Sequence, residues 1–145
     1  APDWDYLKSL RDLWDGALVV KGVLDDAPVA RLVSEGVDAI WVSNHGGRQF
    51  AAAQAGLDVL PRIRKAAGSD YPLIYDGGVR SGTDVLRAIA KGADFVMLGR
   101  AWHWGIGALG AEGAEQVLHI LRAGIAADMG QMAITRPTEA RHRLP

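Results

Sequence analysis

The chain contains no cysteine among its 145 residues, which excludes disulfide bonds, thiolate metal sites and cysteine nucleophiles. Net charge is also nearly absent, because 16 lysines and arginines face 17 aspartates and glutamates. Such a balance gives no basic surface for a phosphate backbone, so no nucleic-acid partner is predicted. No apolar run reaches the roughly 18 residues of a membrane-spanning helix, and the first residues lack the basic-then-apolar order of a secretion signal. We therefore expect a cytoplasmic location.

The sequence does have enough apolar residues, 49%, for the core of one globular unit. Four short apolar runs are each followed by turn residues and a segment of helical periodicity, a pattern typical of βα repeats. The expected strands are 17–20, 37–42, 72–75 and 94–98. The expected helices are 3–14, 28–35, 53–67, 83–91 and 112–128, with Gly36, Gly68 and Gly92 at left-handed positions that end three of them.

This rhythm fits two folds. Four βα units in about 130 residues have the pitch of a (β/α)₈ barrel but supply only half of its usual length of about 250 residues. A small open α/β sheet is the alternative. Both folds bind ligands at the carboxyl ends of their strands, so the strand and helix pattern favours neither fold clearly over the other. Polar residues stand at those ends in each unit: Lys21, His45 with Arg48, Asp76, and Arg100.

A histidine and an arginine follow the second apolar run, in the segment 43–49. His45 can take a proton near neutral pH, and the guanidinium fork of Arg48 can hold a carboxylate through two parallel hydrogen bonds. A lone histidine is more often structural, but the flanking Gly46, Gly47 and Arg48 favour a functional role for His45. The pair suggests chemistry at the carbon next to a carboxylate. His103, His119 and His142 lack such a setting and are interpreted as structural, as are Trp102 and Trp104.

Two glycine-containing loops follow the last two apolar runs. Asp76, Gly77, Gly78 and Arg80 belong to the first loop, and Gly99 with Arg100 form the second. Glycines let the backbone approach an anion, and the next helix offers unpaired N–H groups. Either loop alone could be a plain connection, whereas two such loops with an arginine each favour a phosphate site. Lys21 is either surface charge or, at this rim, a group that holds developing negative charge on a ligand.

Four motifs then stand in a fixed order: 19–23, 43–49, 76–82 and 98–100. Together they resemble the FMN-dependent α-hydroxy acid dehydrogenases and oxidases, a family that includes glycolate oxidase, L-lactate dehydrogenase and mandelate dehydrogenase. The resemblance covers nearly the whole chain. It implies that residues 1–145 are the C-terminal half, strands five to eight, of a TIM (β/α)₈ barrel whose N-terminal half is absent from this chain.

The resemblance also implies roles for residues. Lys21 would stabilise the anionic reduced flavin, Ser43 would contact the ring, and Asp76 would bind the ribityl hydroxyls. His45 would be the base and Arg48 the ligand of the substrate carboxylate in oxidation of an (S)-2-hydroxy acid to the 2-oxo acid. Whether His45 takes the Cα proton or the hydroxyl proton stays open. The FMN phosphate would be held by Gly77, Gly78, Val79, Arg80, Gly99 and Arg100.

The sequence departs from the family pattern in one loop, where Phe50 and Ala51 replace the usual Leu-Asp and Gln54 replaces a common proline. The lost carboxylate bears on the support of Arg48. The resemblance further implies that tyrosines and an aspartate of the missing half complete the site, so that this chain alone would be inactive. Relatives are commonly tetramers, which implies a homo-oligomer, and some associate with membranes through an insertion ahead of this region.

Two other functions remain open. A half-barrel has unpaired edge strands, so the chain could be a noncatalytic fragment that binds FMN or phosphate weakly or self-associates. The remaining option is another phosphate-binding barrel, such as an isomerase or a nucleotide dehydrogenase. The run from Ser43 to Arg48 argues against that option, because a general phosphate barrel needs no such pair of histidine and arginine.

Overall fold

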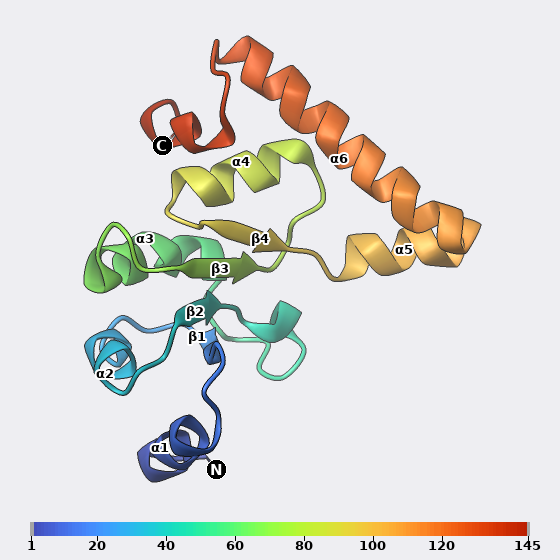
Figure 1. Ribbon diagram of the computed structural model, residues 1–145. Coiled ribbons are helices and arrows are strands. Elements are labelled where there is room, and N and C mark those ends of the chain that lie inside the picture. Colours follow the sequence, from blue (N-terminus) through green and yellow to red (C-terminus); the bar gives the residue numbers. More distant parts are fainter. Residues whose placement is uncertain (1, 145) are drawn as a thin grey trace.

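The computed structural model describes residues 2–144 and contains one four-stranded sheet (Figure 1). Its strands are all parallel and lie in chain order, with each strand beside the next one in sequence. A doubly wound open sheet reverses its strand order at a switch point, and this sheet does not, which favours a barrel segment. The strands are β1 (Val19–Val23), β2 (Ala39–Val42), β3 (Leu73–Asp76) and β4 (Phe95–Met97).

Helices follow the strands as a βα repeat requires. Their limits come from local chemistry: the Asp3 side chain caps the first helix, and Ser81 with Asp84 forms a capping box on the fourth. The helices are α1 (Trp4–Leu13), α2 (Val29–Ser34), α3 (Gly56–Ala67), α4 (Gly82–Ala90), α5 (Arg100–Leu109) and α6 (Ala111–Gln131), with 3-10 turns η1 (His45–Gly47) and η2 (Pro137–His142). Gly36, Gly68 and Gly92 have positive φ, as predicted from their positions.

The core lies between the sheet and the helices α2, α3 and α4. Ile40, Val42 and Leu73 are fully buried there, because alternate residues of each strand point toward the helices. The opposite face of the sheet is open: Val19 is 40% exposed and Phe95 is 61% exposed. One covered and one open face fit half of a barrel, in which the open face would be the barrel interior.

The main difference from expectation is α5, a segment not predicted to be helical. Gly105 and Gly107 lower its helix propensity, so the sequence pattern does not predict a helix there. Tertiary packing against α6 stabilises α5 instead. The two helices approach so closely that a Cβ on Gly113 of α6 would lie 1.8 Å from the Gly105 carbonyl oxygen. The first strand also lies later than expected, so that Lys21 is inside β1, and α3 begins at Gly56 because 50–55 form a loop. Within residues 2–144 no helix has the length and apolarity needed to cross a membrane.

Candidate active site

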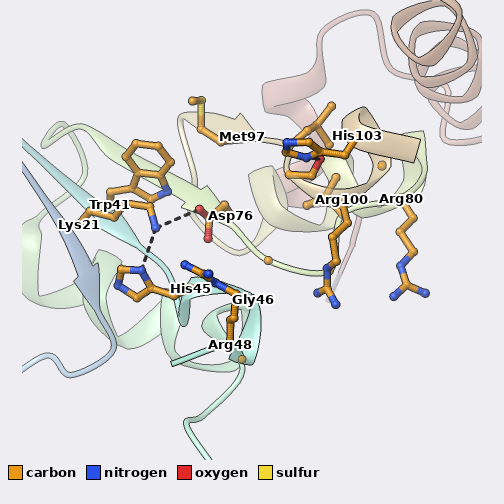
Figure 2. Close-up of a pocket in the computed structure, with 17 residues that line it drawn as sticks. Lys21, Trp41, His45, Gly46, Arg48, Asp76, Arg80, Met97, Arg100 and His103 are labelled. Atoms are coloured by element: carbon orange, nitrogen blue, oxygen red, sulfur yellow. Dashed lines mark hydrogen bonds and ion pairs between the residues drawn. The ribbon is translucent and has the colours of Figure 1, made fainter. Parts of the chain in front are cut away.

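The carboxyl ends of all four strands border one cleft of about 820 Å³ (Figure 2). Parallel strands end at the same edge, which is why residues from four separate motifs meet there. Every residue predicted for the site lines this cleft except Ser43, which is buried beneath it. The predicted lining residues are Lys21, His45, Arg48, Asp76, Gly77, Gly78, Val79, Arg80, Gly99 and Arg100.

Ser43 organises the polar side chains at the floor of the cleft. Its hydroxyl donates to Asp76 Oδ1 and accepts from Lys21 Nζ at 3.1 Å and from the His45 backbone N–H at 3.0 Å. These bonds use its one donor and both acceptor positions, so a fully buried hydroxyl is satisfied. Lys21 Nζ lies 3.5 Å from Asp76 Oδ2 and 3.5 Å from His45 Nδ1. The cation, the carboxylate and the imidazole are therefore held as one unit.

His45 stands in an uncommon backbone conformation. Its φ is 55°, and those of Gly46 and Gly47 are 69° and 74°. Three successive left-handed residues make a sharp turn, which histidine tolerates better than most side chains and which glycine tolerates freely. The ring lies against β1, because a Cβ on Gly22 would come within 2.8 Å of His45 Nε2. The turn thus carries the imidazole to the mouth of the cleft.

Three guanidinium groups border the cleft without a partner. Within residues 2–144, the side chains of Arg48, Arg80 and Arg100 make no hydrogen bond and no ion pair. Arg80 instead lies over the Trp104 ring, 5.4 Å from its centroid. Unpaired cations around one cleft indicate an anionic ligand. Six other arginines pair with acids, whereas Arg122, Arg136 and Arg143, which do not line the cleft, form no ion pair within residues 2–144. The six are Arg11, Arg31, Arg62, Arg64, Arg87 and Arg141.

Backbone donors lie beside two of these arginines. Gly77 and Gly78 have φ of 123° and 72°. A Cβ added at Gly78 or at Gly99 would meet no atom of residues 2–144 within 4 Å, so the space beside both glycines is open. Helix α5 begins at Arg100 without a side-chain cap, and the N–H groups of Arg100 and Ala101, two cleft-lining residues, make no hydrogen bond within residues 2–144. Open glycines, a helix N-terminus and two guanidiniums form a donor set that suits a phosphate group.

Residues 1–144 match the family model described as FMN-dependent dehydrogenase. The chain belongs to this family. It is 46% identical over 124 residues to pre-mycofactocin synthase of Mycolicibacterium smegmatis, covering 86% of this chain and 31% of the relative. It is 44% identical over 119 residues to L-lactate dehydrogenase of Actinobacillus pleuropneumoniae, and this match covers 82% of this chain and 31% of the relative.

Solved structures agree with this family. The fold matches the monotopic membrane protein (S)-mandelate dehydrogenase with a TM-score of 0.91 at 38% identity, covering 96% of this chain and 37% of that one. A mandelate oxidase complex gives a TM-score of 0.91 at 36% identity, and this match covers 97% of this chain and 43% of that one. These relatives confirm the predicted half of a TIM barrel and the FMN-dependent family. The chain spans about a third of the length of the curated relatives that it matches.

Seven lining residues were not among the predicted site residues: Trp41, Gly46, Gly47, Met97, Leu98, Ala101 and His103. His103, interpreted from sequence as structural, lies at the cleft with Nδ1 3.0 Å from the Gly99 carbonyl oxygen. Trp41 Nε1 is buried and has no partner within the described chain, while Lys21 Nζ stands 5.0 Å from the ring centroid. Strand alternation was the available signal, since Trp41 is two residues from Ser43 and faces the same side.

The loop that departs from the family pattern leaves Arg48 without a carboxylate neighbour. Phe50 is 66% exposed, and the side chain of Ala51 has no acceptor for a guanidinium. Gln54 is used elsewhere: its side-chain oxygen accepts from Arg62, and its carbonyl accepts from Asn44 Nδ2 at 3.4 Å. Arg48 is therefore exposed and keeps its whole fork available to a ligand.

Proposed function

We propose that this chain carries the base, the carboxylate ligand and the phosphate site of an enzyme that uses FMN to oxidise an (S)-2-hydroxy acid to the 2-oxo acid. The lactate, mandelate and glycolate class is the proposed substrate range. The observation that carries this proposal is the set of three arginines whose side chains have no hydrogen-bond or ion-pair partner in residues 2–144 and which share one cleft with His45.

The phosphate end of the cleft is proposed from its donors. Arg80 and Arg100 would neutralise the phosphate, and the backbone from Gly77 to Val79 together with Gly99 would approach it closely. Lys21, Ser43 and Asp76 are joined by hydrogen bonds and an ion pair at the floor of the same cleft, and the ring and the ribityl chain would run past them. The hydroxyl-binding role of Asp76 fits a carboxylate that accepts hydrogen bonds.

The substrate end is proposed from His45 and Arg48. The planar fork of Arg48 binds a carboxylate in two places, and this fixes the orientation of the adjacent carbon. Neutral His45 takes one proton from the substrate. FMN, when bound, supplies the acceptor for the two electrons. Lys21 supplies a fixed positive charge next to the site where negative charge develops.

We further propose that residues 1–145 form the C-terminal half of the enzyme and that four additional βα units complete the barrel. The exposed Val19 and Phe95 on the open face of the sheet, and the free edges of β1 and β4, support this arrangement. The catalytic activity belongs to the completed barrel. Assembly into a homo-oligomer and a cytoplasmic or membrane-associated location stay predictions.

The test is a visible spectrum of the protein after incubation with FMN and gel filtration, followed by anaerobic addition of L-lactate, L-mandelate or glycolate. Retained flavin that bleaches with one of these acids supports the proposal. Retained flavin that never bleaches would favour a noncatalytic binding module. No retained flavin in the completed barrel would contradict the proposed phosphate site.

The similarity to pre-mycofactocin synthase gives a second candidate, the reaction of that enzyme. Arg48 separates the two candidates. A hydroxy acid is held by its carboxylate, so its oxidation should be lost in Arg48→Ala. A reaction that does not use a substrate carboxylate should survive this substitution.

A further inference from the structure

Tyr75 is a buried tyrosine that the proposed reaction does not use. It lies in β3, is 4% exposed, and its hydroxyl donates to the Gly77 carbonyl oxygen. Burial, followed by the charges of Asp76, Asp84 and Asp58, raises the pKa of Tyr75 to about 12. The hydroxyl therefore keeps its proton at working pH and stays a donor. Gly56 makes room for the ring, because a Cβ there would lie 3.1 Å from Tyr75 Cε2.

The bond to Gly77 fixes the direction of a peptide group in the cleft wall. In a trans peptide the carbonyl of one residue and the N–H of the next point in opposite directions. The Gly77 carbonyl is held toward the buried hydroxyl of Tyr75, so the Gly78 N–H points away from the core. Gly77 and Gly78 both line the cleft, and the Gly78 N–H makes no hydrogen bond within residues 2–144. This N–H is thus an open donor on the wall assigned to the phosphate.

Two glycines in a row do not hold such a direction by themselves. Glycine populates positive and negative φ about equally, so the peptide between Gly77 and Gly78 could rotate at small energetic cost. A rotated peptide would present its carbonyl oxygen, and hence negative charge density, to a phosphate. The hydroxyl of Tyr75 supplies the constraint that the glycines lack.

We propose that Tyr75 is a positioning residue for the phosphate site: its hydroxyl holds the Gly77 carbonyl so that the Gly78 N–H faces the phosphate of FMN. This inference rests on the proposed function, which assigns the loop 77–80 to that phosphate. Tyr75 is buried and does not line the cleft, so its effect should appear in recognition of the phosphate alone.

The test compares Tyr75→Phe with wild type in the completed barrel by titrating FMN and riboflavin, which differ only in the phosphate. Quenching of flavin fluorescence gives both dissociation constants. We expect Tyr75→Phe to raise the dissociation constant of FMN roughly tenfold and to leave that of riboflavin unchanged. The matched control is Tyr71→Phe, because the Tyr71 hydroxyl also donates to a backbone carbonyl, that of Val37, but far from the cleft. It should change neither constant.

A second variant approaches the same bond without removing the hydroxyl. Gly56→Ala places a methyl group against the Tyr75 ring. It should raise the dissociation constant of FMN by a smaller factor than Tyr75→Phe does and leave that of riboflavin unchanged. An unchanged ratio of the FMN and riboflavin constants in Tyr75→Phe would overturn the inference while leaving the proposed function intact. Equal wild-type affinities for the two flavins, or no binding of either, would overturn the proposed phosphate site and this inference together.

Discussion

The two ends of the same sheet use arginine in opposite ways. At the amino end, Arg64 donates to the carbonyls of Gly68, Tyr71 and Gly92 and pairs with Asp94. At the carboxyl end, Arg48, Arg80 and Arg100 make no such bonds within the described part of the chain. A guanidinium whose donors are all used stabilises the fold, whereas one whose donors are open can bind an anion.

The amino end is built around Asp94. This carboxylate accepts from Arg64, from Arg141 at 2.7 Å and from the Leu73 backbone N–H at 2.9 Å. Burial alone would raise the pKa of Asp94, but the bond from Leu73 and the two arginines outweigh it, so the pKa lies below its ordinary value. Arg141 also ties the C-terminal turn η2 to the carbonyls of Ile89 and Ala93. The cluster thus joins the α3–β3 loop, the α4–β4 loop and the C-terminal segment.

The comparison teaches that catalytic potential in this chain is separated from the groups that stabilise it. Open donors gather at the carboxyl end, where His45 has positive φ and glycine loops line the cleft. A substitution at either end should therefore change one property and spare the other. Four substitutions test this separation.

The largest expected effect is on the reaction. His45→Gln removes the proposed base and should lower the rate of flavin reduction by a hydroxy acid about 10³-fold. Retention of FMN and the unfolding midpoint should not change, because the backbone bond to Ser43 persists. Anaerobic stopped-flow spectroscopy measures the rate, with the exposed His119→Gln in α6 as the control. An unchanged rate would remove His45 from the mechanism.

Arg64→Ala should have the next largest effect, on stability. The side chain is 15% exposed, and its loss leaves Asp94 and several carbonyls short of donors, which should cost about 3 kcal/mol of unfolding free energy. Chemical denaturation measures this loss. Arg62→Ala is the control on the same helix, because its 3.8 Å ion pair with Asp26 and its hydrogen bond to Gln54 are both exposed and should contribute under about 1 kcal/mol. Equal losses in both variants would contradict the division between the two ends.

Arg100→Ala should weaken FMN binding by about 30-fold, near 2 kcal/mol, with little change in stability. The guanidinium has no partner in residues 2–144, so its removal leaves no buried group unsatisfied. Equilibrium dialysis against FMN gives the affinity. Arg87→Ala, an exposed arginine on α4 paired with Asp84, serves as the control and should bind FMN as wild type does.

The smallest effect is a pH dependence at the amino end. Because the pKa of Asp94 is lowered in the folded state, its stabilising contribution is complete above the ordinary value of 3.8 and is lost as the pH falls through the lower folded value. Asp94→Asn should therefore give a shallower fall in unfolding free energy below pH 4 than wild type. Denaturation curves from pH 2.5 to 6 measure the slope, and Asp12→Asn on exposed α1 should keep the wild-type slope.

Much of the fold follows from local patterns in the sequence. Apolar runs predicted the four strands, and Gly36, Gly68 and Gly92 predicted the helix ends because only local backbone conformation decides them. Helix α5 could not be predicted, since contacts between Gly105 and Gly113 outweigh its low propensity. The pairing of Arg64 and Arg141 with Asp94 was also hidden, because those residues are 30 and 47 positions from Asp94 in the chain.

The site was predictable where motifs carried it. The loops around His45 and Gly77 contain the cleft residues in short, recognisable runs, and the structure brings them together. Trp41 and Tyr75 were not predicted, because their positions depend on the folded chain. Trp41 faces the cleft by strand alternation, and the Tyr75 hydroxyl reaches the Gly77 carbonyl only because the chain turns sharply there. A tyrosine in a buried strand looks like ordinary packing until the partner of its hydroxyl is known.

A crystal structure of the protein with FMN tests the central claim most directly, because it locates the cofactor at one end of the sheet. The account predicts the phosphate within about 3.2 Å of the Gly78 N–H and of the guanidiniums of Arg80 and Arg100, with no phosphate contact to His45 or Arg48. A phosphate bound away from the loop 77–80, or a cofactor at the amino end near Arg64 and Asp94, would contradict it.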